Sequence, residues 1–370
     1  MTTRLRIRAP QGRLARLGLA LAAAGVVGLL AVGISAAAPP SPVETGVLSY
    51  TTFSPPALYR VRFHLDGSHL RLGRSALVAR LPGADGVVFG PGGDAFVGAQ
   101  ARGTIEIVDP STGHFTVVPA GGPDAFHMTL SPSGRTIWTA GQPGPLSDVP
   151  IDPPRPGAVH QVTGSTTQIT AIAFDQQGQA FYTNGLDAGP GDFGEIDLHT
   201  FVTRVELPNV AFGRGVGYDP YTGTLYLCGG STIAQVDPAH PTRVLSTLHV
   251  PGMVFDQGTS DGRGHLFMAS NTGQLVVVGF GRSGRLTGPG STLIVANLHV
   301  ALDDVAPLVG PGAAPAGSSS WRTPVIVGLV VWEGLLAATA IAVQLARKYQ
   351  RRPSLPAWDL RRRAGTRPRR

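Results

Sequence analysis

Residues 213–250 constrain the fold of this chain more than any other stretch, because four apolar clusters follow one another within it. The clusters lie at 216–218, 225–228, 233–236 and 244–250, and Gly, Pro, Asp and Ser residues separate them. Short apolar runs with such boundaries are typical of β-strands joined by turns. A single sheet of four short strands leaves its faces uncovered, so the rest of the chain must supply further sheets.

The same pattern repeats along the chain at a nearly constant interval. A turn glycine, two further residues and an apolar pair recur at Gly93, Gly134, Gly178, Gly223 and Gly264, with spacings of 41, 44, 45 and 41 residues. An interval of this size is that of one blade of a β-propeller, in which each four-stranded sheet packs against its neighbours around a common axis. The sequence therefore predicts an all-β repeat fold.

The number of blades follows from the strands that the repeat leaves over. An incomplete first blade has three strands, at 47–53, 58–65 and 76–81, and residues 301–309 form one strand with no other partner. Pairing this last strand with the first blade removes the sheet edges and closes the ring. We expect a six-bladed β-propeller over residues 47–309, with complete blades at 87–119, 125–165, 170–207, 214–250 and 253–298.

Two long apolar segments flank the predicted propeller. Residues 17–38 and 324–346 are each long enough to span a bilayer as a helix. The first follows a basic segment, 1–16, and is either an uncleaved signal anchor or a signal peptide with a cleavage site after Ala38. Both alternatives place the propeller outside the cytoplasm. Residues 39–46 and 310–323 are Pro- and Gly-rich linkers between the spans and the propeller.

Charge is distributed unevenly and sets the expected topology. The net charge is +7, but residues 1–16 carry +5 and residues 347–370 carry +9, so residues 17–346 carry −7. An acidic central region does not favour nucleic acid as a partner. Basic clusters at the outer ends of both spans indicate that both termini are cytoplasmic. The tail at 347–370 is either a topology signal alone or also a binding segment for anionic lipid headgroups.

Glu333 is an ionisable residue near the middle of the second predicted span. An ionised carboxylate at that depth costs at least about 2.5 kcal/mol. We expect Glu333 to be a tolerated neutral residue, to pair with another membrane protein, or to reach water through local thinning of the bilayer. The single cysteine, Cys228, cannot form an intramolecular disulfide and is expected to be a small buried core residue.

The hairpin motifs resemble those of a broad class of propellers. The segments 131–138 (SPSGRTIW), 219–226 (DPYTGTLY) and 105–109 (IEIVD) are similar to the repeats of NHL, YVTN and SMP-30/gluconolactonase-like proteins, a class that also includes streptogramin lyases. The resemblance covers roughly residues 45–310. It implies a six- or seven-bladed propeller, and members of the class include lactonases, lyases and binding scaffolds. The metal ligands of the lactonases have no counterpart here that can be aligned, so the resemblance assigns no catalytic residue.

Polar residues at the start of the innermost strands are the candidate site. In a propeller these positions surround one mouth of the central channel, and a set rich in carboxylates with one His and one Arg could bind a divalent cation or an anionic or sugar-like ligand. The alternative is that these residues only form turns, for which Asp is well suited. The candidates are Asp85, Asp124, His127, Gln168, Arg214, Asp256, Asp303 and Asp304.

The sequence favours a binding role over catalysis. It contains no phosphate-binding loop, no metal-binding pair of cysteines, and no HExxH or serine-nucleophile motif. We interpret the chain as a membrane-tethered bacterial propeller that binds a ligand or another surface protein outside the cytoplasm. The alternative is a metal-dependent lactonase or lyase that uses the funnel residues, with a divalent cation as cofactor.

The topology prediction can be checked on intact cells. Single cysteines placed in the surface loops of the propeller should react with a membrane-impermeant thiol reagent, whereas a cysteine near Arg362 should react only after the membrane is opened. The unsubstituted chain, with Cys228 alone, gives the background. Labelling of the tail from outside would contradict the predicted orientation.

Overall fold

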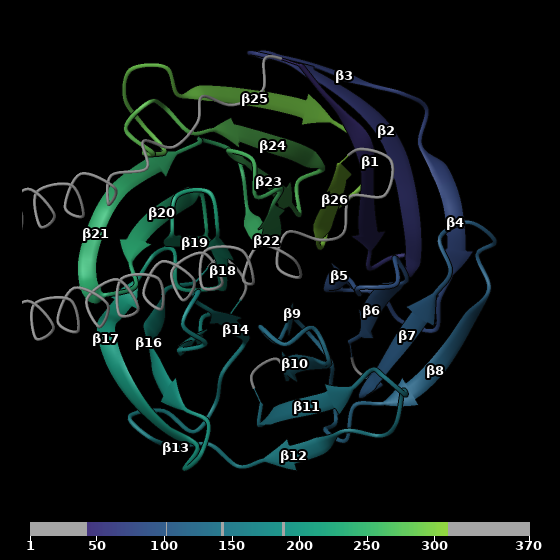
Figure 1. Cartoon of the computed structure of the whole chain (residues 1–370), viewed down its shortest axis with the longest axis vertical. Helices are drawn as coiled ribbons and strands as arrows, with labels where there is room; N and C mark the ends of the chain where they lie inside the picture. Colours follow the sequence, from purple (N-terminus) through teal and green to yellow (C-terminus); the bar gives the residue numbers. More distant parts are fainter. Residues whose placement is uncertain (1–42, 101, 142–143, 187–188, 310–370) are drawn as a thin grey trace, which may run out of the picture. The chain divides into compact units, whose positions relative to one another are not determined.

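Six β-sheets arranged around one axis form the part of the chain that the computed structural model describes, residues 43–309 without 101, 142–143 and 187–188 (Figure 1). All regular secondary structure within these residues is β-strand. Each sheet has its innermost strand near the axis and its outermost strand at the rim. The predicted all-β, six-bladed propeller is therefore confirmed.

The sheet that closes the ring contains strands from both ends of the described region. It consists of β26 (Val305–Val309), β1 (Val43–Thr52), β2 (Ala57–Asp66), β3 (His69–Leu72) and β4 (Ala76–Arg80). The second sheet consists of β5 (Val87–Phe89), β6 (Ala95–Ala99), β7 (Thr104–Val108) and β8 (Phe115–Pro119). The third consists of β9 (Met128–Leu130), β10 (Thr136–Ala140), β11 (Leu146–Pro150) and β12 (Ala158–His160).

The remaining three sheets follow the same order along the chain. The fourth consists of β14 (Ala171–Phe174), β15 (Ala180–Thr183), β16 (Gly191–Asp197), β17 (Val202–Val210) and the short β13 (Thr163–Gly164). The fifth consists of β18 (Gly215–Asp219), β19 (Thr224–Gly229), β20 (Thr232–Asp237) and β21 (His240–His249). The sixth consists of β22 (Phe255–Ser260), β23 (His265–Ser270), β24 (Gln274–Gly279) and β25 (Thr292–Asn297).

Ring closure occurs by the predicted pairing of the last strand with the first. Strand β26 runs antiparallel to β1, with Gly46 opposite Val309 and Tyr50 opposite Val305. Each innermost strand also contacts the innermost strands of both neighbouring sheets, in the order β5, β9, β14, β18, β22, β26 and back to β5. Every innermost strand of the described ring therefore has a neighbouring innermost strand on each side.

Three details differ from the expected strand boundaries. Strand β1 begins at Val43 rather than Val47, because its ladder with β2 continues to Asp66. The outer strand of the first sheet is divided into β3 and β4, which pair with different ends of β2. Strand β13, expected in the blade at 125–165, instead runs parallel to β17 of the next sheet, because Thr203 binds the backbone of the β13 segment through its backbone and its hydroxyl.

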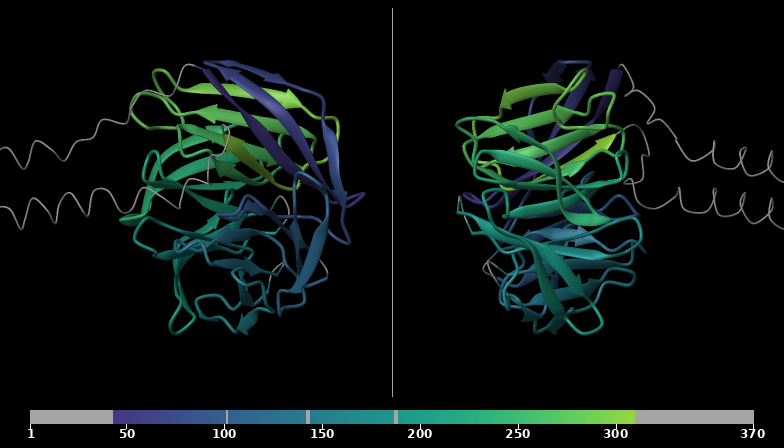
Figure 2. Two further views of the ribbon diagram at one scale, coloured as in Figure 1. Left: turned by 45° about the vertical axis from the view of Figure 1, so that its right-hand side comes forward. Right: turned by 90° about the vertical axis from the view of Figure 1, so that its left-hand side faces the viewer.

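The hydrophobic core lies between neighbouring sheets. At the closure, Phe63 of β2 packs against Phe267 of β23 with ring centroids 5.2 Å apart, and Leu48 and Val277 belong to the same cluster. The side views show β1 and β2 (purple) beside the sixth sheet (green), although the two segments are far apart in sequence (Figure 2). Strands such as β23 are buried along their whole length because sheets cover both faces.

The predicted membrane segments cannot be compared with this architecture. The spans 17–38 and 324–346, Glu333, the basic segments 1–16 and 347–370, and the linker residues 39–42 and 310–323 lie outside the described residues. Between Val43 and Val309, the structure has no helix with the length and apolar character that a membrane span requires.

Deletion of residues 301–309 should prevent folding, because it removes the innermost strand of the closing sheet and leaves β1 with an unpaired edge. We expect the deletion variant of the otherwise complete chain to elute as an aggregate in size-exclusion chromatography.

Leu302→Ala, at a fully buried position, should lower the free energy of unfolding by about 2–5 kcal/mol. Leu293→Ala, 45% exposed on β25, is the matched control and should change it by less than about 0.5 kcal/mol. A folded, monodisperse deletion variant would contradict the closure.

Candidate axial site

Six of the eight predicted residues come together where the innermost strands meet. His127 and Arg214 immediately precede β9 and β18, and Asp85 lies two residues before β5. Asp256 is the second residue of β22, and Asp303 and Asp304 precede β26. All six are less than 9% exposed. The blade repeat explains this convergence, since equivalent positions of successive innermost strands face the same axis. We refer to these six residues as the axial cluster.

Asp124 and Gln168 do not belong to the axial cluster. Asp124 is half-buried and Gln168 is exposed. The backbone amide of Gln168 donates to the hydroxyl of Thr166, which in turn donates to the Gln168 carbonyl, so this segment forms a local turn. The hydrogen bonds around Gln168 are those of the turn interpretation.

Asp256 connects three blades through one carboxylate oxygen. Its Oδ1 lies 2.8 Å from His127 Nε2 and 2.8 Å from Arg214 Nε. The third and sixth sheets lie on opposite sides of the axis, so the contact between His127 and Asp256 crosses it (Figure 1). Gln257 makes a second crossing contact by donating from Nε2 to the Met128 carbonyl at 3.3 Å. Polar side chains therefore fill the centre of the ring at this level.

The His127 imidazole is held in a neutral, buried environment. Burial lowers its pKa, and this effect outweighs the opposing attraction of Asp256. The Phe126 ring stacks on the imidazole, with 3.9 Å between the ring centroids. The Cζ atom of the Arg214 guanidinium lies 5.8 Å from the centroid of the same Phe126 ring. With the Nε2–H directed at Asp256, Nδ1 is the acceptor, and it has no hydrogen-bond partner among the described residues.

Asp304 has a structural role. Its Oδ2 accepts a hydrogen bond from the Val87 amide at 2.8 Å, and its Oδ1 accepts one from the Val305 amide at 2.7 Å. The Asp304 amide also donates to the hydroxyl of Thr51 at 3.0 Å. Burial raises the pKa of Asp304 well above its usual value despite these bonds. The carboxyl therefore connects the start of β26 to β5, and the backbone amide of Asp304 connects it to β1.

Asp85 and Asp303 differ from Asp304 because each has a buried oxygen without a hydrogen-bond donor. Among the described residues, Asp85 Oδ1 and Asp303 Oδ2 have no such partner. Burial raises the pKa of Asp85 well above its usual value, and repulsion by Asp256 and the other axial carboxylates raises it further. Burial and repulsion by Asp256 raise the pKa of Asp303 to about 8, against the attraction of Arg214. These two groups can bind protons or a cation.

Hydroxyl and thiol groups of the second strands position the backbone of the axial cluster, a role that was not predicted from the sequence. Thr51 donates to the Asp85 carbonyl, Thr183 donates to the Arg214 carbonyl at 2.6 Å, and Cys228 donates to the Asp256 carbonyl at 3.2 Å. Cys228 is buried as expected, and burial raises the pKa of its thiol. These residues occupy equivalent positions in successive repeats, and this equivalence is the sequence signal that could have indicated their shared role.

No family model matches the sequence, and no curated protein is significantly similar to it. Solved structures with a similar arrangement include a Bacteroides uniformis protein assigned as a 6-phosphogluconolactonase, with a TM-score of 0.46, 13% identity and coverage of 72% of this chain and 100% of that one. Virginiamycin B lyase from Staphylococcus aureus has a TM-score of 0.44 and 11% identity, with coverage of 70% of this chain and 89% of that one. A streptogramin B lyase has a TM-score of 0.44 and 15% identity, with coverage of 72% of this chain and 86% of that one. The strand order and register given above establish the fold without these comparisons.

The raised pKa of Asp303 predicts a pH-dependent stability. Because the folded state holds the Asp303 proton up to about pH 8 and the unfolded state releases it near the usual value of 3.8, the free energy of unfolding should fall as pH rises through this window. Asp303→Asn should flatten the dependence between about pH 5 and pH 8 in urea unfolding experiments. Asp124→Asn, outside the cluster, is the control. An equal slope in the Asp303→Asn variant would contradict the assignment.

Proposed function

We propose that the chain is a membrane-tethered binding propeller, placed outside the cytoplasm, whose axial cluster binds a small cation or the cationic group of a ligand. The observation that carries this proposal is the pair of donor-free buried oxygens on Asp85 and Asp303. A buried carboxylate oxygen without a donor costs free energy, and a bound cation would remove that cost.

The charge balance of the axial cluster supports a cationic ligand over an anionic one. Four carboxyl groups, on Asp85, Asp256, Asp303 and Asp304, surround the single guanidinium of Arg214 in this cluster. Asp256 Oδ1 lies 2.8 Å from Arg214 Nε and offsets the charge of that guanidinium, although Nε has no hydrogen-bond partner among the described residues. The donor-free carboxyl oxygens of Asp85 and Asp303 favour hard cations such as Ca²⁺. Asp303, at 8% exposure, is the carboxylate of the cluster that is closest to solvent.

The cellular setting rests on the sequence alone. The apolar segments 17–38 and 324–346 and the arginine clusters outside them support a propeller tethered at both ends. On this proposal the partners are the membrane and a ligand or protein at the cell surface, with no role for nucleic acid. Cleavage after Ala38 would leave the second span as the tether.

The proposal can be tested by titrating the purified full-length chain with calcium chloride, and separately with putrescine as an organic cation, in a calorimeter. One of the two should bind with a stoichiometry near one per chain. Asp85→Asn and Asp303→Asn should each weaken that binding at least tenfold, because each removes a carboxylate charge while keeping the shape of the side chain. Asp124→Asn is the matched control and should bind like the unsubstituted protein. If neither probe binds, or if the Asn variants bind the probe as tightly as the unsubstituted chain, the proposal is contradicted.

A second candidate is an enzyme of the lactonase or lyase type. The specific observation in its favour is the pairing of a neutral, buried His127 with Asp256, since a carboxylate that orients an imidazole is a common feature of general bases. His127→Gln separates the candidates. Both proteins are assayed with a panel of lactones. Turnover by the unsubstituted chain and not by the His127→Gln variant would favour the enzyme. If neither protein turns over a lactone and both bind the cation equally well, the binding protein is favoured.

A further inference from the structure

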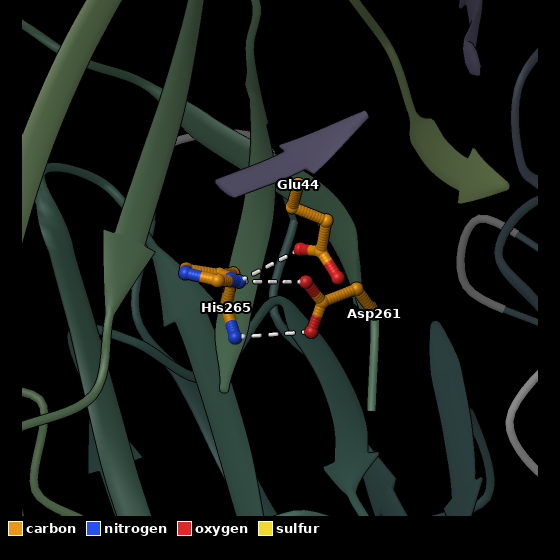
Figure 3. A group of neighbouring side chains, drawn as sticks. All are labelled: Glu44, Asp261 and His265. Carbon is orange, nitrogen blue, oxygen red and sulfur yellow. Dashed lines mark hydrogen bonds and ion pairs between the residues drawn. The ribbon is translucent and has the colours of Figure 1, made fainter. Parts of the chain in front are cut away.

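A second buried polar cluster lies at the closure of the ring, at the opposite end of β1 from the axial cluster. It consists of Glu44 in β1, Asp261 in the turn after β22, and His265 at the start of β23 (Figure 3). Their exposures are 3%, 6% and 5%. Seven residues of extended strand separate Glu44 from Thr51 at the axial cluster, roughly 23 Å. We refer to these three residues as the closure cluster.

All three side chains direct one potential ligand atom at the same point. His265 Nδ1 lies 2.8 Å from Asp261 Oδ2 and 3.1 Å from Glu44 Oε2, and the ligand atoms all lie within 4.8 Å of one another. Figure 3 shows the imidazole nitrogen facing both carboxylates. Burial disfavours the charged imidazole, but the hydrogen bond to Asp261 and the attraction of both carboxylates outweigh this effect and raise the pKa of His265 to about 9.

The single proton on His265 Nδ1 cannot satisfy both the Asp261 and the Glu44 carboxylates. Nδ1 carries a single hydrogen, and Asp261 is the nearer acceptor. Glu44 Oε2 then remains buried with no hydrogen-bond donor among the described residues. Glu44 Oε1 has a weak contact with Arg263 Nη1 at 3.5 Å, and that side chain is half exposed. An unsatisfied carboxylate oxygen, nearly fully buried and facing a carboxylate and an imidazole, is the arrangement expected at a cation-binding site.

The same turn occurs in the fourth sheet without the extra ligands. Asp175 Oδ1 accepts hydrogen bonds from the amides of Gln177 and Gln179, at 2.9 and 2.8 Å. Asp261 Oδ1 makes the equivalent bonds to the amides of Arg263 and His265, at 2.7 and 3.0 Å. The turn therefore forms with Gln at the position of His265. The imidazole and the Glu44 carboxylate are additions that turn geometry does not require.

We propose that the closure cluster is a binding site for a divalent transition-metal ion, with Glu44, Asp261 and His265 as protein ligands and zinc as the ion that the donor set fits best. Zinc takes His nitrogen and carboxylate oxygen ligands at about 2.0–2.2 Å in tetrahedral geometry, which places neighbouring ligand atoms roughly 3.3 Å apart. The observed separations of 2.8 and 3.1 Å are within half an ångström of this value. The ion would replace the shared proton.

Charge and anchoring also favour zinc at this position. Two carboxylates and a neutral imidazole balance the two positive charges of the ion, so the buried complex is neutral. The backbone amides of Arg263 and His265 fix the Asp261 carboxylate through its other oxygen, which is the supporting contact that metal ligands commonly have. Because Glu44 belongs to the first sheet and the other two ligands to the sixth, the ion would link the two sheets at the closure.

The test uses the purified full-length chain, stripped with a chelator and titrated with zinc chloride in a calorimeter. We expect one zinc ion per chain and a higher melting temperature with zinc than without it. Glu44→Gln, Asp261→Asn and His265→Gln should each weaken zinc binding at least tenfold and remove the zinc-dependent rise. Circular dichroism of each variant without zinc checks that it is folded.

Two matched variants make the result specific. Asp175→Asn changes the equivalent turn of the fourth sheet and should bind zinc like the unsubstituted chain. Asp303→Asn removes a carboxylate of the axial cluster and should also leave zinc binding unchanged. The proposal is overturned if the unsubstituted chain binds no zinc, if the folded closure-cluster variants bind it equally well, or if Asp303→Asn rather than His265→Gln abolishes binding. None of these outcomes decides whether the axial cluster binds calcium or putrescine.

Discussion

The pairing of β26 with β1 is the interaction on which the rest of the structure depends. In the other sheets, apart from the short pairing of β13 with β17, neighbouring strands follow one another along the chain, so their ladders close short loops. The first sheet instead joins segments about 260 residues apart, with Tyr50 opposite Val305. Closing so long a loop costs more chain entropy than closing a hairpin. The buried contacts between the first and sixth sheets, such as Phe63 with Phe267, offset that cost.

The axial cluster combines structural and unsatisfied carboxyl groups at adjacent positions. Asp304 uses both oxygens to accept hydrogen bonds from backbone amides, so its carboxyl group helps to hold β26 in place. Asp256 bridges His127 and Arg214 and so connects three blades. Neither arrangement explains Asp85 and Asp303, whose donor-free oxygens destabilise the ring when ionised. Groups that cost stability and bind no protein donor are more often associated with ligands than with folding.

The sequence predicted the architecture well because the repeat is local. The turn glycines and the leftover segment at 301–309 were sufficient for six blades and their closure. Six of the predicted axial positions lie together at the innermost strands, whereas Gln168 is exposed in a local turn with Thr166. The closure cluster could not be predicted. Glu44 lies in a segment expected to be a linker, and its approach to His265 depends on the packing of two sheets that are distant in sequence.

The two polar clusters depend on the same strand, and this relates ligand binding to ring closure. Strand β1 provides Glu44 to the closure cluster at one end, and at its other end Thr51 binds the backbone of Asp85 and Asp304. Neither set of groups is assembled unless β1 lies between β26 and β2. A ligand that binds only the closed ring stabilises it by about 2.7 kcal/mol at a concentration one hundred times its dissociation constant. That gain is comparable to the effect of a buried leucine in the closure, so occupancy of either cluster would stabilise the closed ring without any change in its contacts.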